Sequence, residues 1–100
     1  MFRHVVLLSF GPHSAPGAID EVVTRLRALP GEVPTIRAYS VGRDAKLASG
    51  NADLAVVADF DDEDGYRLYA THPAHLAVIT TAIAPILSSR VAVQYEMDAV

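Results

Sequence analysis

The chain has 100 residues, of which 51% are hydrophobic, with no cysteine and a formal net charge of −4 at pH 7. This length suits one domain with its own core. The lack of cysteine excludes disulfides and thiolate metal sites and fits a reducing cytoplasm. The acidic balance argues against nucleic acid and anionic membranes as partners. No apolar run approaches the roughly 20 residues of a membrane span, and the N-terminus lacks a signal-peptide layout, so we expect a soluble cytoplasmic domain.

The first part of the chain predicts a strand, a helix and a second strand. The run His4–Phe10 (HVVLLSF) is short, apolar and rich in β-branched residues, which is typical of a buried strand. A helix follows, with Pro16 in its first turn, and Pro30-Gly31 end it. Ile36–Val41 predicts the second strand. The helix has one apolar stripe at helical spacing, formed by Ile19, Val22, Val23, Leu26 and Leu29.

The remaining chain predicts a loop, a strand, two helical stretches and a final strand. Asp44–Asn51 has the composition of a surface loop, and Asp53–Phe60 predicts the third strand. The acidic run 61–64 (DDED) indicates a helix start and not a metal site, because a carboxylate there satisfies free backbone amides. A second helical stretch begins near Pro73, and its apolar positions are Leu76, Ile79, Ile83, Ile86 and Leu87. Arg90–Glu96 predicts the last strand.

The element order strand, helix, strand, strand, helix, strand predicts a ferredoxin-like α+β sandwich over residues 1–96, with a short tail at 97–100. Such a fold has a four-stranded antiparallel sheet with helices on one face only. The other face should be polar in a monomer, yet the first and third strands are apolar on both sides. Covering a sheet face of roughly 350 Å² would stabilise each subunit by on the order of 9 kcal/mol, as an upper estimate. We therefore expect a homodimer through the sheet face, a dimeric α+β barrel.

The segment 69–75 (YATHPAH) gathers a phenol and two imidazoles within seven residues. Histidine has an ordinary pKa of about 6.5, so it can exchange a proton near neutral pH. His75 lies four residues before Ile79 and eight before Ile83, which predicts a place on the inward, apolar side of its helix. His72 directly precedes Pro73, and its expected role is in a cap or turn at the helix start.

His4 and Tyr69 complete the candidate catalytic set. His4 alternates with Val6 and Leu8 along the first strand, so it should face the same way as they do. The Tyr69 hydroxyl can donate to a carbonyl or enolate oxygen. A neutral imidazole opposite such a donor suits proton abstraction next to a carbonyl, the first step of an aldol-type ring closure. The expected substrate-binding wall comprises Val6, Leu8, Tyr66, His72, Ile79, Ile83 and Gln94.

Five stretches of the chain resemble the Dabb family, the stress-responsive dimeric α/β-barrel domain. They are HVVLLSF, LPGEVP, NADLAVVADF, YATHPAH and VAVQYE, and the resemblance spans residues 2–96. The most specific part is the HPAH segment that follows a tyrosine. The resemblance implies a ferredoxin-like subunit that dimerises through its sheet.

Related proteins of this type include a plant polyketide cyclase (olivetolic acid type), which closes a ring by an intramolecular aldol reaction on a poly-β-keto thioester. The resemblance implies that its catalytic tyrosine and histidine fall on Tyr69 and His75, and another pocket histidine on His4. An acidic residue on the last strand that orients the cyclase's histidine falls on Gln94. Glutamine can accept a hydrogen bond from an imidazole but supplies no charge, so the resemblance implies weaker support for an imidazolium at His75.

Three functions stay open at this point. The leading hypothesis is a homodimer whose apolar cavity binds a carbonyl-containing aromatic or polyketide-like molecule and, if it is an enzyme, cyclises it without a cofactor. The second is a non-catalytic stress or structural protein with a packed core in place of a pocket. A cofactor-free monooxygenase fits less well, since the chain has no tryptophan. No metal is expected, because His72 and His75 lack further ligands at zinc-binding spacing.

Overall fold

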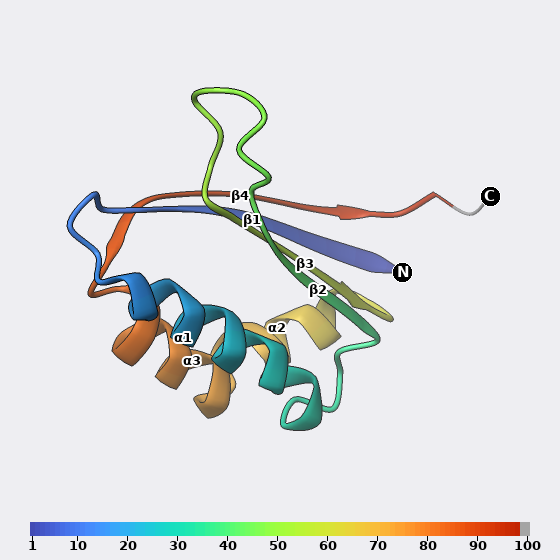
Figure 1. The fold of residues 1–100 in the computed structure, drawn as a ribbon. Coiled ribbons are helices and arrows are strands. Elements are labelled where there is room, and N and C mark those ends of the chain that lie inside the picture. The colour runs from blue at the N-terminus through green and yellow to red at the C-terminus, as the bar shows by residue number, and fades with distance from the viewer. Residues whose placement is uncertain (99–100) are drawn as a thin grey trace.

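The computed structural model describes residues 1–98, so the last two residues of the predicted 97–100 tail lie outside the described residues. Strands and helices follow in the order expected for a ferredoxin-like fold (Figure 1). They are β1 (Phe2–Phe10), α1 (Pro16–Ala28), β2 (Ala38–Arg43), β3 (Leu54–Phe60), α2 (Glu63–Thr71), α3 (Pro73–Val78) and β4 (Leu87–Glu96). A 3-10 turn, Leu29–Gly31, follows α1, and a π-helical turn, Ile79–Ile83, follows α3.

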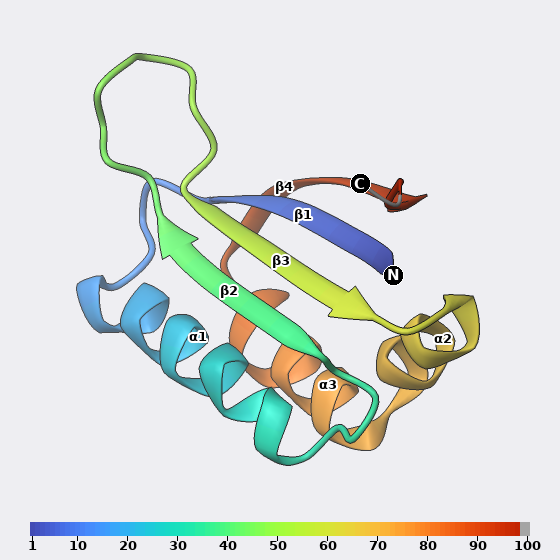
Figure 2. The same ribbon diagram turned by 90° about the vertical axis from the view of Figure 1, so that its right-hand side faces the viewer.

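The four strands form one antiparallel sheet in the order β2-β3-β1-β4. All the helices lie on one face of this sheet, and the long β2–β3 loop rises on the opposite side (Figures 1 and 2). The predicted α+β ferredoxin-like class is therefore confirmed. None of the helices within residues 1–98 is long and apolar enough to cross a membrane.

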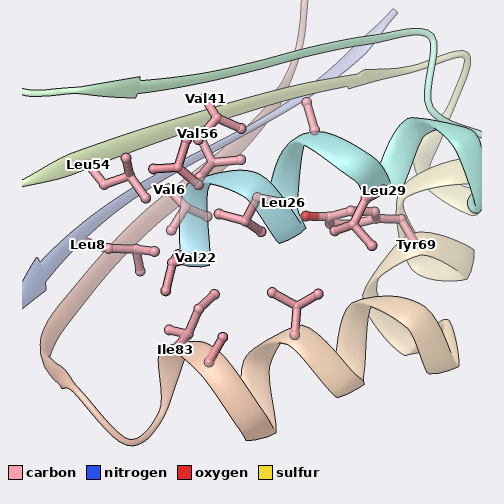
Figure 3. Close-up of a cluster of buried hydrophobic side chains, with 14 of the residues drawn as sticks. Val6, Leu8, Val22, Leu26, Leu29, Val41, Leu54, Val56, Tyr69 and Ile83 are labelled. Carbon is pink, nitrogen blue, oxygen red and sulfur yellow. The ribbon is translucent and has the colours of Figure 1, made fainter. Parts of the chain in front are cut away.

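The core lies between the sheet and the helices. Along β1 the side chains alternate, so that Val6 and Leu8 are buried on the helix side while Leu7 is 42% exposed on the other. Figure 3 shows Val6, Leu8 and Val56 of the sheet pointing toward Leu26 of α1. The predicted stripe of α1 is confirmed, since Val22, Val23, Leu26 and Leu29 are buried and Ile19 packs against them.

Four predicted boundaries differ from the structure. β1 begins at Phe2 instead of His4, and β3 begins one residue late, at Leu54. β2 is displaced by two residues from the predicted Ile36–Val41, because the Ile36 amide first closes a turn onto the Val33 carbonyl. β4 begins at Leu87 instead of Arg90, and the prediction that Leu87 continues the helix was wrong. Leu87 pairs with Phe10 across a register shift in β1 that periodicity does not reveal.

Helix α2 begins as the acidic run predicts. The Asp62 carboxylate is the N-cap and accepts a hydrogen bond from the Gly65 amide at 2.9 Å. Gly65 packs tightly against the end of β3, where an added Cβ would come within 3.2 Å of the Phe60 Cβ. The cap and this close contact fix the angle at which α2 leaves the sheet, and α2 supplies Tyr66 and Tyr69 to the candidate site.

We predict that Asp62→Ala lowers the free energy of unfolding by about 1 kcal/mol, because it leaves an amide of the first turn without its partner. Urea denaturation followed by circular dichroism measures this. Asp62→Asn keeps a capping oxygen and should recover most of the loss. Equal destabilisation by both substitutions would show that the cap contributes little.

Candidate functional site

A cavity of about 270 Å³ lies between the helix face of the sheet and the chain from α2 to the π-helical turn. His4, Tyr69 and His75 all line it, so the structure brings the three predicted catalytic side chains together. Of the predicted wall, Val6, Leu8, Tyr66, Ile79 and Ile83 also line it.

Two predicted wall residues, His72 and Gln94, are not among the residues that line the cavity. The His72 ring lies at the start of α3, where its Nδ1 accepts a hydrogen bond from the Ala74 amide at 3.1 Å. The expected capping role of His72 is thus confirmed. Gln94 is exposed on β4, and it acts on the cavity only through His4.

His4 is a buried, neutral imidazole held in one tautomer. Its side chain is on the helix side of β1, directly opposite Gln94 of β4 in the sheet register, and is 3% exposed. The Gln94 amide Nε2 donates to His4 Nδ1 at 2.8 Å, so the ring proton is on Nε2. Burial, and then the positive charge of Arg90, lowers the pKa of His4 to about 4.

His75 has the opposite tautomer. Its Nδ1 donates to the Ala70 carbonyl at 3.2 Å, which leaves Nε2 as the unprotonated nitrogen. Burial lowers the pKa of His75, so this ring is also neutral at pH 7. The expectation that Gln94 supports His75 is corrected, because Gln94 bonds His4 and a backbone carbonyl orients His75.

Within residues 1–98, no side-chain nitrogen or oxygen is both fully buried and without a hydrogen-bond partner. Neither His4 Nε2 nor His75 Nε2 has a hydrogen-bond partner in the part of the chain that the structure describes, so both atoms reach accessible space. Since both rings line the cavity, it contains one N–H donor and one lone-pair acceptor from two neutral imidazoles.

Tyr69 differs from the expected arrangement. Its ring is 2% exposed and stacks on His75, with ring centroids 4.1 Å apart and planes at 30°. Its hydroxyl lies 2.9 Å from the hydroxyl of Tyr39, so the phenol oxygen does not stand opposite the imidazole as predicted. Burial raises the pKa of Tyr69 and of Tyr39, which keeps both phenols protonated at neutral pH.

Two polar side chains of the site were not predicted from the sequence, Tyr39 on β2 and Arg90 on β4. Tyr39 holds the Tyr69 hydroxyl from a strand 30 residues away in sequence, a pairing for which no local pattern exists. Arg90 lines the cavity. Alternation along the last strand could have found it, because Arg90 and Gln94 occupy the same side of β4. No group of three or more His, Cys, Asp or Glu side chains in the described part of the chain is placed to hold a metal ion.

Comparison with known proteins gives consistent matches over nearly the whole chain. A family described as "Stress responsive A/B Barrel Domain" (Dabb) matches residues 2–97. A stress-response A/B barrel domain-containing protein of Arabidopsis thaliana is 24% identical over 102 residues, covering 99% of this chain and 88% of that protein.

Two solved structures are similar in both sequence and fold. The first, from Thermobifida fusca, is described as a dimeric ferredoxin-like protein and is 44% identical, with a TM-score of 0.88 over 96% of this chain and 90% of that chain. The second, from Bacteroides fragilis, is described as dimeric with a ferredoxin-like fold and is 27% identical. Its TM-score is 0.85 over 96% of this chain and 95% of that chain.

The buried His4 predicts a specific pH dependence of stability. Its pKa is about 4 when folded and about 6.5 when unfolded, so between these values only the unfolded chain binds the proton. Stability should therefore fall as the pH drops through this window, and His4 should contribute about 2 kcal/mol of the loss between pH 7 and pH 5.

Urea denaturation of His4→Gln at pH 7 and pH 5 measures this contribution. The variant should lose less stability on acidification than the unsubstituted protein does. His13→Gln, at an exposed histidine, is the matched control and should behave like the unsubstituted protein. The same pH dependence in His4→Gln would contradict a buried neutral ring.

Proposed function

The chain belongs to the stress-responsive A/B barrel (Dabb) family, and on that basis we propose that it forms a homodimer whose cavity binds a small carbonyl-containing aromatic or polyketide-like molecule. One observation supports the ligand most strongly. A single apolar cavity contains the unprotonated Nε2 of His75 and the Nε2–H donor of His4. A cytoplasmic location is part of the proposal and rests on the lack of cysteine.

The homodimer follows from the sheet face that the helices leave uncovered. On this face Leu7 pairs with Val91, and Val5 with Val93. Val91 and Val93 are 65% and 54% exposed. Contiguous apolar side chains on neighbouring strands are costly to leave in water, and a second copy of the same face would cover them.

The same face also has a polar pair at one end. The Arg3 guanidinium donates twice to the Asp59 carboxylate, at 2.7 and 2.9 Å. This hydrogen-bonded pair lowers the pKa of Asp59 and keeps both charges matched within one subunit. The pair can therefore lie at an interface without needing a charged partner from the second copy.

We predict that Val93→Asp converts the dimer to a monomer at micromolar concentration, because it places a charge in the centre of the apolar interface. Sedimentation velocity should show about half the mass of the unsubstituted protein. Leu68→Asp makes the same change at an exposed leucine of α2, on the other side of the sheet, and should leave the dimer intact. An unsubstituted protein that sediments as a monomer would refute the interface.

For the chemistry, we propose that His75 Nε2 removes a proton from the carbon next to a ligand carbonyl. The resulting enolate attacks a second carbonyl of the same molecule, which forms the ring bond, and the new alkoxide takes the proton back from the imidazolium. The His4 Nε2–H can donate to the enolate oxygen. When Tyr39 donates to the Tyr69 oxygen, the Tyr69 proton is available as a second donor.

A non-catalytic binding protein is the second candidate, and a specific observation favours it. The Tyr69 hydroxyl is engaged by Tyr39, and its ring stacks on His75. The two groups thus resemble a packed aromatic cluster more than an acid and a base facing each other across a substrate. A cofactor-free monooxygenase gains no specific support from the cavity.

Acetophenone distinguishes the two candidates, because it has exchangeable protons next to its carbonyl and no second carbonyl to react with. We predict that the protein accelerates deuterium incorporation into its methyl group in D2O, followed by proton NMR. His75→Asn should lower the catalysed rate by at least about 100-fold, in line with general-base contributions.

Two further measurements complete the test. His13→Asn alters an exposed histidine, and this variant should catalyse the deuterium exchange at the same rate as the unsubstituted protein. Saturation-transfer NMR reports binding separately from turnover. Binding of acetophenone with exchange no faster than in buffer would reject the general base and favour the binding protein.

A further inference from the structure

Arg90 differs from the other arginines of the chain. Six of the seven arginines donate a side-chain hydrogen bond to a protein oxygen. Their acceptors are Asp59, Thr81, the Val41 carbonyl, Asp61, Asp20 and Glu63. Within residues 1–98, no hydrogen bond or ion pair is formed by the guanidinium of Arg90. A guanidinium offers five donors, so Arg90 has unused capacity to bind an anion.

The position of Arg90 directs this donor capacity toward the opening of the cavity. It lies on edge strand β4, opposite Leu8 of β1 in the register and on the helix side of the sheet. Its side chain is exposed and also lines the cavity, which places it where the cavity meets solvent. The neighbouring cavity wall is apolar, with Leu8 and Leu87 beside it.

Among the described residues that line the cavity, Arg90 alone carries a full charge. No aspartate or glutamate is among them, and both cavity histidines are neutral at pH 7. Burial is the main cause that lowers the pKa of each ring, and the charge of Arg90 adds to it, so the guanidinium acts on both rings electrostatically. In a chain of net charge −4, this is a local positive site at an apolar opening.

We propose that Arg90 binds the carboxylate of a ligand whose apolar body fills the cavity. This inference rests on the proposed function and narrows its ligand class to aromatic or acyl carboxylic acids. A planar guanidinium matches a carboxylate with two parallel hydrogen bonds. One arginine balances one negative charge, whereas a phosphate dianion would keep a second charge unbalanced, because no other charged side chain is among the described residues that line the cavity.

A structural role would explain Arg90 differently. A charged side chain on an edge strand discourages pairing with another sheet, and such a residue needs no ligand. That role predicts the same affinity for an acid and for its neutral analogue. The two explanations therefore predict different ratios between the dissociation constants of the acid and of its neutral analogue.

The test compares trans-cinnamate with trans-cinnamamide, which share one skeleton and differ in charge. Isothermal titration calorimetry at pH 7 and low salt gives the two dissociation constants. The ratio should favour the acid by about tenfold in the unsubstituted protein, the typical effect of a charge-assisted pair, and should fall toward one in Arg90→Gln. Arg90→Lys keeps the positive charge but lacks the two parallel donors of a guanidinium, so it should retain part of the preference for the acid over the amide.

Arg67→Gln is the matched control, since Arg67 is an exposed arginine of α2 that pairs with Glu63 and does not line the cavity. It should keep the full preference for the acid. Raising the salt concentration to about 0.5 M should weaken the binding of cinnamate and leave the binding of cinnamamide unchanged, because screening acts on the charged ligand alone.

The outcomes separate this inference from the proposed function. Equal binding of acid and amide, or an acid preference that survives in Arg90→Gln, would overturn the carboxylate site and leave the cavity as a ligand site. Binding of neither compound would overturn both. An acid preference lost in Arg90→Gln and kept in Arg67→Gln would establish the carboxylate site.

Discussion

The central strand β1 has apolar side chains on both faces of the sheet, and both faces must be covered. It pairs with β3 on one side and β4 on the other, and its side chains are apolar on both faces. Val6 and Leu8 are covered by the helices, while Val5 and Leu7 face the side that no helix covers. Because one sheet cannot bury both faces with one layer of helices, the fold has an internal apolar space and an external apolar surface.

The chemistry of the site follows from the same strand. His4 occupies a position of β1 at which its neighbours on that face are buried and apolar, so burial keeps its imidazole neutral. His75 reaches the same space from α3 and is neutral for the same reason. The partners differ, a side-chain amide for His4 and a backbone carbonyl for His75, and they give the two rings opposite tautomers. One cavity therefore holds both a donor and an acceptor without any net charge of its own, apart from Arg90 at its opening.

Periodicity and capping predicted the elements, the fold class and the inward side of His4 and His75, because these depend on local spacing. The hydrogen-bond partners of these side chains were harder to predict from the sequence. The bond between Tyr39 and Tyr69 joins β2 to α2, and the resemblance to a cyclase assigned Gln94 to the wrong histidine. These errors have one cause. Local patterns predict which face a side chain occupies, but the register between distant strands decides which atoms meet.

Two neutral imidazoles of opposite tautomer share one cavity. Long-range nitrogen-15 correlation spectra of the histidine rings at pH 7 provide the test, since they distinguish the two neutral tautomers from the cation. We predict a proton on Nε2 of His4 and on Nδ1 of His75, with neither ring charged. An imidazolium at either position, or the same tautomer in both rings, would contradict it.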